Sequence, residues 1–226
     1  MIVPDDSVME DAKTAKRVQL AAKALAGAGL VHAYGHCSVR CGPDRFMVSA
    51  ATSLKLAAKE PVTICPVEGV LPEGVLGEVR IHQKIYAARA DVGAVCRIMP
   101  PAVMALSTHG IVPLPRHGIG AYFTKLPLWD DPRLLRNDAA AEQLAAALGD
   151  APAIVMRGNG AVVAAATIEQ AVTLSWFLED AARIERDVRA MGLPSEDGRL
   201  DAAEARDRQV WAGGVAERMW DYLTRD

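Results

Sequence analysis

The sequence has few of the features that mark membrane, nucleic-acid-binding or secreted proteins. Its aromatic content is 5%, it has four cysteines, and 25 basic against 28 acidic residues give a net charge of −3. It contains no uncharged apolar stretch of the ~20 residues that a membrane helix requires and no lysine- and arginine-rich cluster of the kind that binds nucleic acid. The opening residues, MIVPDD, lack the cationic start and apolar run of a secretory signal. We therefore expect a cytoplasmic protein with neither a membrane nor a nucleic-acid partner.

The cysteines are too few for a disulfide framework. Cys37 and Cys41 have a spacing that a metal could use, but Cys65 and Cys96 form no second close pair. Without a secretory signal, reduced thiols are the default state. We predict free cysteines, three of them serving as small apolar side chains in the core, in preference to a disulfide or a structural zinc.

Common nucleotide-binding and hydrolase motifs are also missing. The sequence has neither a G-x-G-x-x-G nor a P-loop pattern, and no G-x-S-x-G elbow. It does have 226 residues, of which 51% are hydrophobic and 23% charged. That composition is enough to bury the core of one large α/β domain. We expect a single domain over residues 1–226.

Hydrophobic periodicity predicts a mixture of helices and strands without a strict βαβ repeat. Helices are predicted over residues 7–29, 78–89, 102–108, 137–148 and 167–191, and from about 201 to the end of the chain. Strands are predicted over residues 37–40, 45–50, 61–67 and 92–98, with a hairpin joining 153–156 to 161–165 through R-G-N-G. This mixture favours a mostly antiparallel sheet covered by helices.

The most informative segment is residues 78–101, which read EVRIHQKIYAARADVGAVCRIMPP. This resembles the class II aldolase/adducin pattern Glu-x3-His-x2-Ile-Tyr-x2-Arg-x-Asp-Val-x-Ala-Val-x-His-x-His-Pro-Pro. Residues 35–40, GHCSVR, resemble the family's Gly-[Asn/His]-x-Ser-x-Arg loop. The family's metal-binding histidines fall on Arg97, Met99 and Asn159. The chain is thus similar to a divergent family member that lacks the three metal-binding histidines.

The resemblance covers about residues 10–190 and implies a fold and an assembly. The implied fold is a three-layer α/β/α single domain with a mixed, mostly antiparallel central sheet, followed by a helical segment over 195–226. The implied assembly is a homotetramer with its site between subunits. We expect the aromatic C-terminal residues Trp211, Trp220 and Tyr222 to help cover that site.

The matched positions also imply roles for individual side chains. Glu78 falls on the family's acid/base carboxylate. Arg97 places a fixed cation with five donors where the metal would be, and could bind a carboxylate or stabilise an enolate oxygen. His36 is the better placed histidine for carrying a proton. The candidate catalytic residues are therefore Glu78, Arg97 and His36, and the candidate substrate-binding residues are Asn159, Ser38, Met99 and Gly35.

Each of these side chains also has a purely structural explanation. Glu78 suits the start of any helix. Arg97 could form an ion pair with Glu78 or Asp91, and Met99 could fill the core. Asn159 lies between two glycines, where tolerance of left-handed backbone alone would explain it.

The histidines leave a second question open. His36 could serve only as a hydrogen-bonding loop residue, and the resemblance implies a structural role for His82. His109 and His117 flank a proline-containing loop. No pair of histidines has ligand spacing, so we expect no metal and no other cofactor, although a site built from His36, His109 or His117 stays an alternative.

Two departures from the sugar-phosphate members of the family concern the substrate. Leu76 and Gly77 precede Glu78 where those members have small hydroxyl residues. His36 stands where sugar-phosphate aldolases have asparagine. Both differences argue against a phosphorylated substrate, and the histidine favours a carboxylate or aromatic one.

Together these patterns predict a lyase-type enzyme that acts on a small-molecule substrate. The expected reaction is aldol cleavage or decarboxylation of a small non-phosphorylated oxo- or hydroxy-acid, aromatic acids included, without the usual divalent metal. Two alternatives remain: a catalytically silent member that binds a ligand or a partner chain, and an isomerase or epimerase that acts through an enolate. A solvent-connected pocket around Glu78, Arg97 and Asn159 would favour an enzyme, and a site filled by packed Met99 would favour a silent protein.

Overall fold

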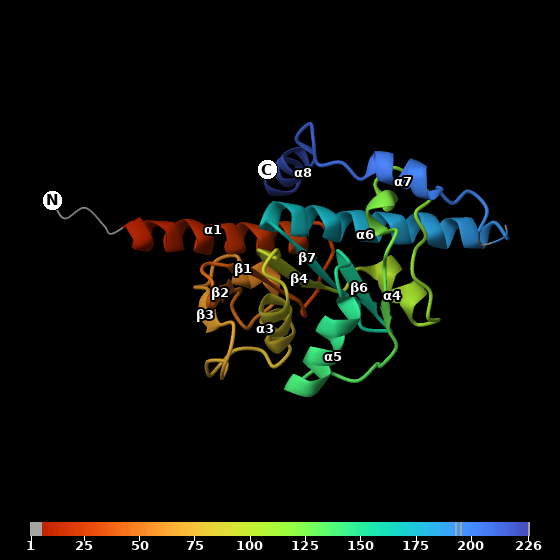
Figure 1. The fold of residues 1–226 in the computed structure, drawn as a ribbon. Helices are drawn as coiled ribbons and strands as arrows, with labels where there is room; N and C mark the ends of the chain where they lie inside the picture. Colours follow the sequence, from red (N-terminus) through yellow and green to blue (C-terminus); the bar gives the residue numbers. More distant parts are fainter. Residues whose placement is uncertain (1–5, 193, 195, 226) are drawn as a thin grey trace.

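The chain folds into three layers, as Figure 1 shows for the computed structural model, which describes residues 6–192, 194 and 196–225. A mixed sheet forms the middle layer. Helices α1 (Asp6–Gly27) and α6 (Ile168–Ala190) cover one face. Helices α3 (Val79–Ala88) and α5 (Asp138–Leu148) cover the other. The predicted three-layer α/β/α fold is confirmed.

The sheet is mostly antiparallel, as predicted. Its strands in chain order are β1 (His36–Arg40), β2 (Arg45–Val48), β3 (Thr63–Pro66), β4 (Ala94–Ile98), β5 (Leu128–Trp129), β6 (Ala153–Met156) and β7 (Ala161–Ala165). Their spatial order is β3-β2-β1-β4-β7-β6-β5. The edge strand β5 runs parallel to β6, and the other pairings of described strands are antiparallel. The expected hairpin between β6 and β7 is present.

Alternating side chains of the central strands supply two separate hydrophobic clusters. Cys96 points toward α1 and α6, where it joins Leu25 and Phe177. Val95 points the other way and packs with residues of α3 and α5, including Ile85. Because successive strand residues face opposite sides, a strand buried on both faces is apolar throughout. A charged residue within β4 is therefore exceptional and marks a site.

The C-terminal segment differs from the expected single helix. It forms α7 (Ala202–Arg208) and α8 (Val215–Thr224). Asp201 begins α7 with a capping box. The two helices are separated because Gly213 and Gly214 both have positive φ, 78° and 71°, which an α-helix does not accommodate. The prediction of one helix from residue 201 was wrong, because it followed the aromatic and apolar pattern of the segment and overlooked the two glycines.

Three short elements were also absent from the sequence-based prediction. They are α2 (Leu54–Ala57), the 3-10 helix η1 (Gly120–Phe123) and the two-residue strand β5. The short helix α4 (Pro101–Ser107) was expected over nearly the same residues. Elements this short carry too few residues for a periodic signal. None of the described helices combines the length and apolar character that a membrane crossing requires.

The loop before β1 brings β1 and β4 together. Gly35 has φ +142°, and a Cβ there would lie 2.6 Å from Val31 Cγ1 and 3.0 Å from the Arg97 carbonyl oxygen. Only glycine fits this approach. His36 is then directly opposite Arg97 in the β1–β4 ladder. The two side chains therefore lie on the same face of the sheet.

Buried carboxylates and guanidinia fix the ends of the elements beside this pair. Arg40 donates to the carbonyls of Tyr86 (2.6 Å) and Val92 (3.0 Å), which attaches the end of α3 to the sheet. Glu179 of α6 accepts from the backbone amides of Ala102 (3.0 Å) and Val103 (3.2 Å) at the start of α4. A negative charge is favourable at a helix N-terminus. Helix α4 is thus held where β4 ends.

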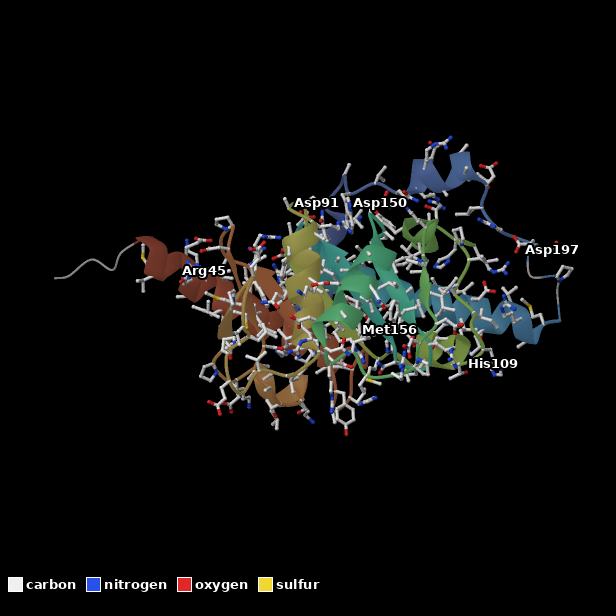
Figure 2. All side chains as sticks on the ribbon, turned by 60° about the horizontal axis from the view of Figure 1, so that its bottom comes forward. Arg45, Asp91, His109, Asp150, Met156 and Asp197 are labelled. Carbon is white, nitrogen blue, oxygen red and sulfur yellow. The ribbon has the colours of Figure 1, made fainter. Side chains whose placement is uncertain are left out.

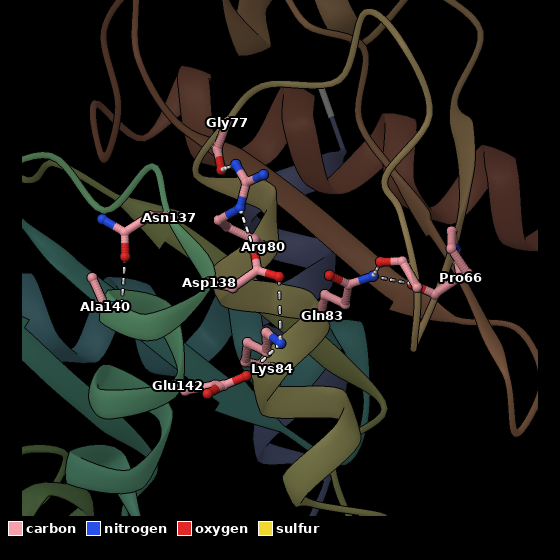
Figure 3. Close-up of polar contacts among 10 residues, drawn as sticks. Pro66, Gly77, Arg80, Gln83, Lys84, Asn137, Asp138, Ala140 and Glu142 are labelled. Atoms are coloured by element: carbon pink, nitrogen blue, oxygen red, sulfur yellow. Dashed lines mark hydrogen bonds and ion pairs between the residues drawn. The ribbon is translucent and has the colours of Figure 1, made fainter.

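Helix α3 is tied to its neighbours by polar contacts along its outer side (Figure 3). Arg80 and Lys84 pair with Asp138 and Glu142 of α5 at 2.8 and 2.6 Å. Gln83 donates to the carbonyl of Pro66 at 2.9 Å. Partly exposed ion pairs of this kind each contribute little, about 0–1 kcal/mol. Their joint effect is to fix the rotation of α3, whose opposite face carries Glu78, His82 and Tyr86.

Gly160 offers a test of how closely β4 and the β6–β7 turn approach. Its φ is +77°, and an added Cβ would lie 2.0 Å from the Ile98 carbonyl oxygen. We expect Gly160→Ala to lower the free energy of unfolding by about 3 kcal/mol or more, because backbone atoms must move. Chemical denaturation measures this change.

Gly198→Ala is the matched control for that experiment. Gly198 has φ +72°, but nothing lies within 4 Å of its added Cβ. It should lose only the backbone strain, about 1–2 kcal/mol. Equal losses in the two variants would show that the close approach at Gly160 is unimportant for stability.

Candidate functional site

A cluster of buried polar side chains lies between the sheet and α3. Glu78 occupies the N-cap position of α3, and His82 follows one turn later on the same helix. His36 comes from β1 and Arg97 from β4. Asn159 comes from the turn between β6 and β7. The fold therefore brings together four of the predicted site residues, Glu78, Arg97, Asn159 and His36, from distant parts of the chain.

Arg97 is the centre of one half of the cluster. Its side chain is only 3% exposed. Nη2 donates to Asn159 Oδ1 at 2.8 Å and lies 3.4 Å from Glu78 Oε2, and Nη1 donates to the Ile98 carbonyl at 3.0 Å. Burial lowers the pKa of Arg97, and Glu78 partly offsets that. A guanidinium nevertheless stays charged at neutral pH, so this half of the site holds a fixed positive charge beside one carboxylate.

The other half is a chain of hydrogen bonds that runs from His36 into the core. His36 Nδ1 lies 2.7 Å from His82 Nε2. His82 Nδ1 lies 2.6 Å from Ser38 Oγ, which lies 2.8 Å from Tyr86 Oη. All four residues are at most 2% exposed. Three short links in series hold each ring in one orientation.

Both histidines of this chain are neutral at physiological pH. Burial, then His82 and Arg97, holds the pKa of His36 well below its ordinary value. Burial and Arg97 lower the pKa of His82 from 6.5 to about 3. Burial also raises the pKa of Tyr86. Desolvation penalises the charged form in each case, so the chain carries hydrogen bonds but no net charge.

Four polar atoms of the cluster have no hydrogen-bond partner within the described part of the chain. They are His36 Nε2, Glu78 Oε1, Arg97 Nε and Asn159 Nδ2. Buried polar atoms are nearly always paired, and each exception calls for an explanation. Four exceptions from four segments that converge on one place indicate a ligand site. Since Arg97 Nε and Asn159 Nδ2 are donors and a carboxylate oxygen is an acceptor, the ligand must offer both kinds of group.

The structural explanation for Asn159 is wrong. Among the described residues, no residue other than glycine has a positive φ, and Gly158 and Gly160 supply the left-handed positions of this turn, at 63° and 77°. The backbone therefore does not require asparagine. Its side chain instead accepts from Arg97 and holds a free amide toward the site.

The structural explanation for Glu78 is not supported by its contacts, and that for Arg97 is incomplete. Glu78 makes no side-chain capping hydrogen bond at the start of α3. Arg97 does pair with Glu78, whereas Asp91 pairs with Arg89 at 2.6 Å. The Arg97–Glu78 pair leaves Arg97 Nε and Glu78 Oε1 unused. An ion pair alone therefore does not account for the arrangement.

The remaining predicted substrate-binding residues lie at different depths. Met99 directly follows β4, is half-buried, and belongs to neither hydrophobic cluster, so it is not the packed filler that a silent site would have. Ser38 is fully buried, and its hydroxyl is engaged by His82 and Tyr86. Gly35 contributes close packing under Arg97. The groove of about 460 Å³ between α3 and α5 is lined by other residues, among them Gln83 and Lys84.

The donor set at the three family positions does not fit a divalent metal. Arg97 is a cation that would repel one, Met99 is a poor ligand for hard ions, and Asn159 Oδ1 already accepts from Arg97. The described residues contain no group of three or more His, Cys, Asp or Glu side chains that could hold a metal.

The histidines of the alternative metal site also lie apart. His109 is exposed beyond the end of α4 (Figure 2), and His117 contacts Asp180 at 2.9 Å. All four cysteines are free, and burial raises the pKa of Cys37 to about 12.

Sequence reasoning missed the continuity of the hydrogen-bond chain. It assigned His82 a structural role and gave Tyr86 no role. A signal was present in the spacing, because Glu78, His82 and Tyr86 are four residues apart and share one face of α3. Polar side chains on the buried face of a helix require partners. Ser38 and His36, two residues apart on β1, are those partners.

Comparisons with known proteins identify the family of this chain. A model of the class II aldolase and adducin N-terminal domain matches residues 16–186. The chain is 27% identical to a 3,4-dihydroxyphthalate decarboxylase of Rhodococcus jostii (strain RHA1), with 83% of this chain and 84% of that protein covered. It is 28% identical to a 3,4-dihydroxyphthalate decarboxylase of Arthrobacter keyseri, with 84% and 87% covered.

A solved structure supports the fold. The L-fuculose 1-phosphate aldolase from Glaciozyma antarctica PI12 superposes with a TM-score of 0.79 at 21% identity, covering 99% of this chain and 93% of that one. At such low identity the likeness establishes the architecture and leaves the chemistry to the site residues.

The two buried histidines predict that stability falls in mild acid. The unfolded state protonates near pH 6.5, whereas folded His82 protonates only at about 3 and folded His36 also well below 6.5. Below pH 6.5 the unfolded state thus binds more protons, so the free energy of unfolding decreases as pH falls, by up to about 1.4 kcal/mol per pH unit for each histidine. Urea denaturation at about pH 7, 6 and 5 measures the slope. His82→Gln should reduce it and the exposed His109→Gln should not; a flat wild-type profile would contradict the assignment.

Proposed function

Because the chain belongs to the class II aldolase and adducin family, we propose that it is a decarboxylase acting on a small hydroxylated aromatic carboxylic acid that carries no phosphate. The observation that carries the proposal is the set of unpartnered atoms on Arg97, Asn159 and Glu78. The relatives named 3,4-dihydroxyphthalate decarboxylase support the reaction and the substrate class. The closeness of their lengths to this chain supports carrying that reaction over.

The proposed substrate satisfies the free atoms of the site. A carboxylate or phenolate oxygen accepts from Arg97 Nε and Asn159 Nδ2, and a ring hydroxyl donates to Glu78 Oε1. Asn159 is itself oriented by Arg97, at 2.8 Å. Leu76 and Gly77 before Glu78 supply no side-chain hydroxyl for a phosphate, which is why the proposed substrate carries none.

The proposed chemistry needs one carboxylate and one fixed cation. Glu78 takes the proton of the ring hydroxyl and delivers it to the adjacent ring carbon that bears the carboxylate, which gives a non-aromatic ketone. The carbon–carbon bond then breaks, its electron pair restores the aromatic ring as a phenolate, and carbon dioxide leaves. Solvent protonates the phenolate. The net change is loss of carbon dioxide and gain of one proton, and Arg97 stabilises the phenolate oxygen throughout.

Arg97 in the metal's place limits the substrate. A guanidinium stabilises developing negative charge less than a divalent metal does. It therefore suits a ring that is already electron-rich, as a dihydroxylated ring is. The substrates of aldol cleavage and of enolate isomerisation have no such electron-rich ring. A silent ligand-binding protein remains the alternative that the assays below address.

We further propose that the active form is a cytoplasmic homotetramer. Met99 is half-buried directly after β4. Tyr222 is 72% exposed on α8, while Trp211 and Trp220 pack partly onto the α1–α6 side of the chain. A neighbouring subunit would complete the cover over the site.

Metal content gives one test. We expect purified protein to hold no stoichiometric zinc, manganese or iron, because a guanidinium stands among the family's ligand positions. Elemental analysis measures this, and chelator treatment should leave decarboxylation unchanged. A triple variant, Arg97→His with Met99→His and Asn159→His, should gain metal and serves as the positive control. Close to one tightly held metal per wild-type chain would contradict the proposal.

Activity of Arg97 variants gives the second test. Release of carbon dioxide is measured with 3,4-dihydroxyphthalate and a panel of hydroxybenzoates. Arg97→Lys and Arg97→Met should each lower kcat/KM by about 10²–10³-fold, as loss of an oxyanion donor does, since a point charge cannot replace the planar fork. Full activity in Arg97→Met would remove Arg97 from the mechanism.

Arg17→Lys is the matched control, because Arg17 of α1 pairs with Glu169 of α6 on the other side of the sheet from the cluster. It should keep wild-type activity. If the protein is a silent binder, no panel member is turned over, and Arg97→Lys changes the melting temperature while ligand binding stays nearly intact.

A further inference from the structure

The hydrogen-bond chain from Tyr86 to His36 has a direction that can be derived by counting hydrogens. Neutral His36 and His82 each carry one ring N–H, and Ser38 and Tyr86 each carry one O–H. These four hydrogens serve the three links Tyr86–Ser38, Ser38–His82 and His82–His36. When every link is made, one hydrogen remains. It lies on His36 Nε2, on Tyr86 Oη, or on Ser38 Oγ if that oxygen accepts from both neighbours. A hydrogen left on Ser38 would be fully buried, and the described residues give Ser38 Oγ no side-chain partner besides Tyr86 and His82. That leaves the two ends of the chain.

The environments of the two ends differ. Tyr86 is 2% exposed, and Ser38 is its only side-chain hydrogen-bond partner within the described residues. A hydrogen left on Tyr86 Oη would point into the cluster formed by Phe46, Ile85 and other apolar residues. His36 Nε2 is instead one of the four unpartnered atoms of the candidate ligand site. A buried donor without an acceptor is strongly unfavourable, so the free hydrogen belongs on His36.

Burial keeps the Tyr86 hydroxyl protonated, and contacts with Arg40 hold the residue in place. Burial raises its pKa, so the phenol does not ionise. Arg40 lies 4.8 Å from the centre of the Tyr86 ring and donates to the Tyr86 carbonyl, which anchors the residue. The cation faces the ring and leaves the hydroxyl to Ser38. Tyr86 therefore donates to Ser38, Ser38 donates to His82 Nδ1, and His82 Nε2–H donates to His36 Nδ1.

We propose that Tyr86, Ser38 and His82 are positioning residues that hold His36 as the neutral Nε2–H tautomer, so that His36 is a fixed hydrogen-bond donor to the substrate. This deepens the proposed function and rests on it for the identity of the substrate. It replaces the expectation that His36 carries a proton. With Nδ1 occupied by His82, His36 has no free lone pair with which to act as a base.

The site offers the substrate more hydrogen-bond donors than acceptors, and this affects its specificity. His36 Nε2, Arg97 Nε and Asn159 Nδ2 all donate, and Glu78 Oε1 alone accepts. A ligand with several oxygen acceptors and at least one hydroxyl meets this pattern, as an ortho-hydroxylated aromatic carboxylate does. An ammonium group or an amide N–H facing His36 would meet a donor and be rejected.

The tautomer can be measured without turnover. Nitrogen-15 and proton NMR of histidine-labelled wild-type protein at about pH 7 distinguishes the two neutral tautomers and the imidazolium. The His36 signals are identified by their loss in His36→Gln. We expect the Nε2–H form. An Nδ1–H form or an imidazolium would overturn the proposal.

Ser38→Ala tests whether the chain sets the tautomer. Without the serine donor, His82 Nδ1 has nothing to accept from, so both tautomers of His36 should appear, and binding of 3,4-dihydroxyphthalate should weaken about tenfold. Ser175→Ala is the matched control, because Ser175 is equally buried and its hydroxyl donates to Ala171 within α6. It should change neither property. A Ser38→Ala protein with His36 entirely in the Nε2–H form would refute the positioning role.

These readouts separate the two proposals. If no hydroxylated aromatic acid is decarboxylated but His36 is the Nε2–H tautomer and responds to Ser38→Ala, the proposed function fails and the positioning chain stands. If decarboxylation is found and His36 has the opposite tautomer, the reverse holds.

Discussion

The charge of Arg97, buried in the middle of an apolar strand, is the constraint on which the rest of the site depends. A guanidinium that is 3% exposed cannot lose its proton at neutral pH and must find partners. Glu78 and Asn159 pair with it. Its charge also contributes, after burial, to the lowered pKa of both histidines. Removing one partner of such a group typically costs about 3–5 kcal/mol. The cation therefore fixes the position of Glu78, the carboxylate proposed to act as acid and base.

The two histidines of the site are neutral because they are buried and because Arg97 beside them is charged. Beside a fixed cation, a protonated histidine would be repelled, and burial adds to the penalty. His36 and His82 can pack against Arg97 only because both stay neutral. Neutral rings need defined donors and acceptors, and Ser38 and Tyr86 supply them. Electrostatics at Arg97 thus explains why the hydrogen-bond chain continues as far as the core.

The fold could be predicted from the sequence, but part of the site could not. The family resemblance gave the layers, the sheet and the positions of Glu78, Arg97 and Asn159. The break between α7 and α8 was missed, although two adjacent glycines disfavour a helix there. The structural explanation of Asn159 had to stay open, since the sequence does not tell which residue of a Gly-Asn-Gly turn is left-handed. His82 and Tyr86 were undervalued because hydrogen-bond continuity exists only in three dimensions.

Replacing a metal by an organic cation changes what such a fold can do. A metal accepts lone pairs from ligand and substrate alike, so a metal site is organised around acceptors. A guanidinium offers only hydrogen-bond donors. Each neighbour must therefore present an acceptor to it. Asn159 must present oxygen to Arg97 and amide to the ligand, and the orientation seen here does so. Among the unpartnered atoms of the cluster, Glu78 Oε1 is then the one acceptor. The proposed hydroxy-acid substrate would pair with it through its hydroxyl, whereas a bare carboxylate would leave it unpaired.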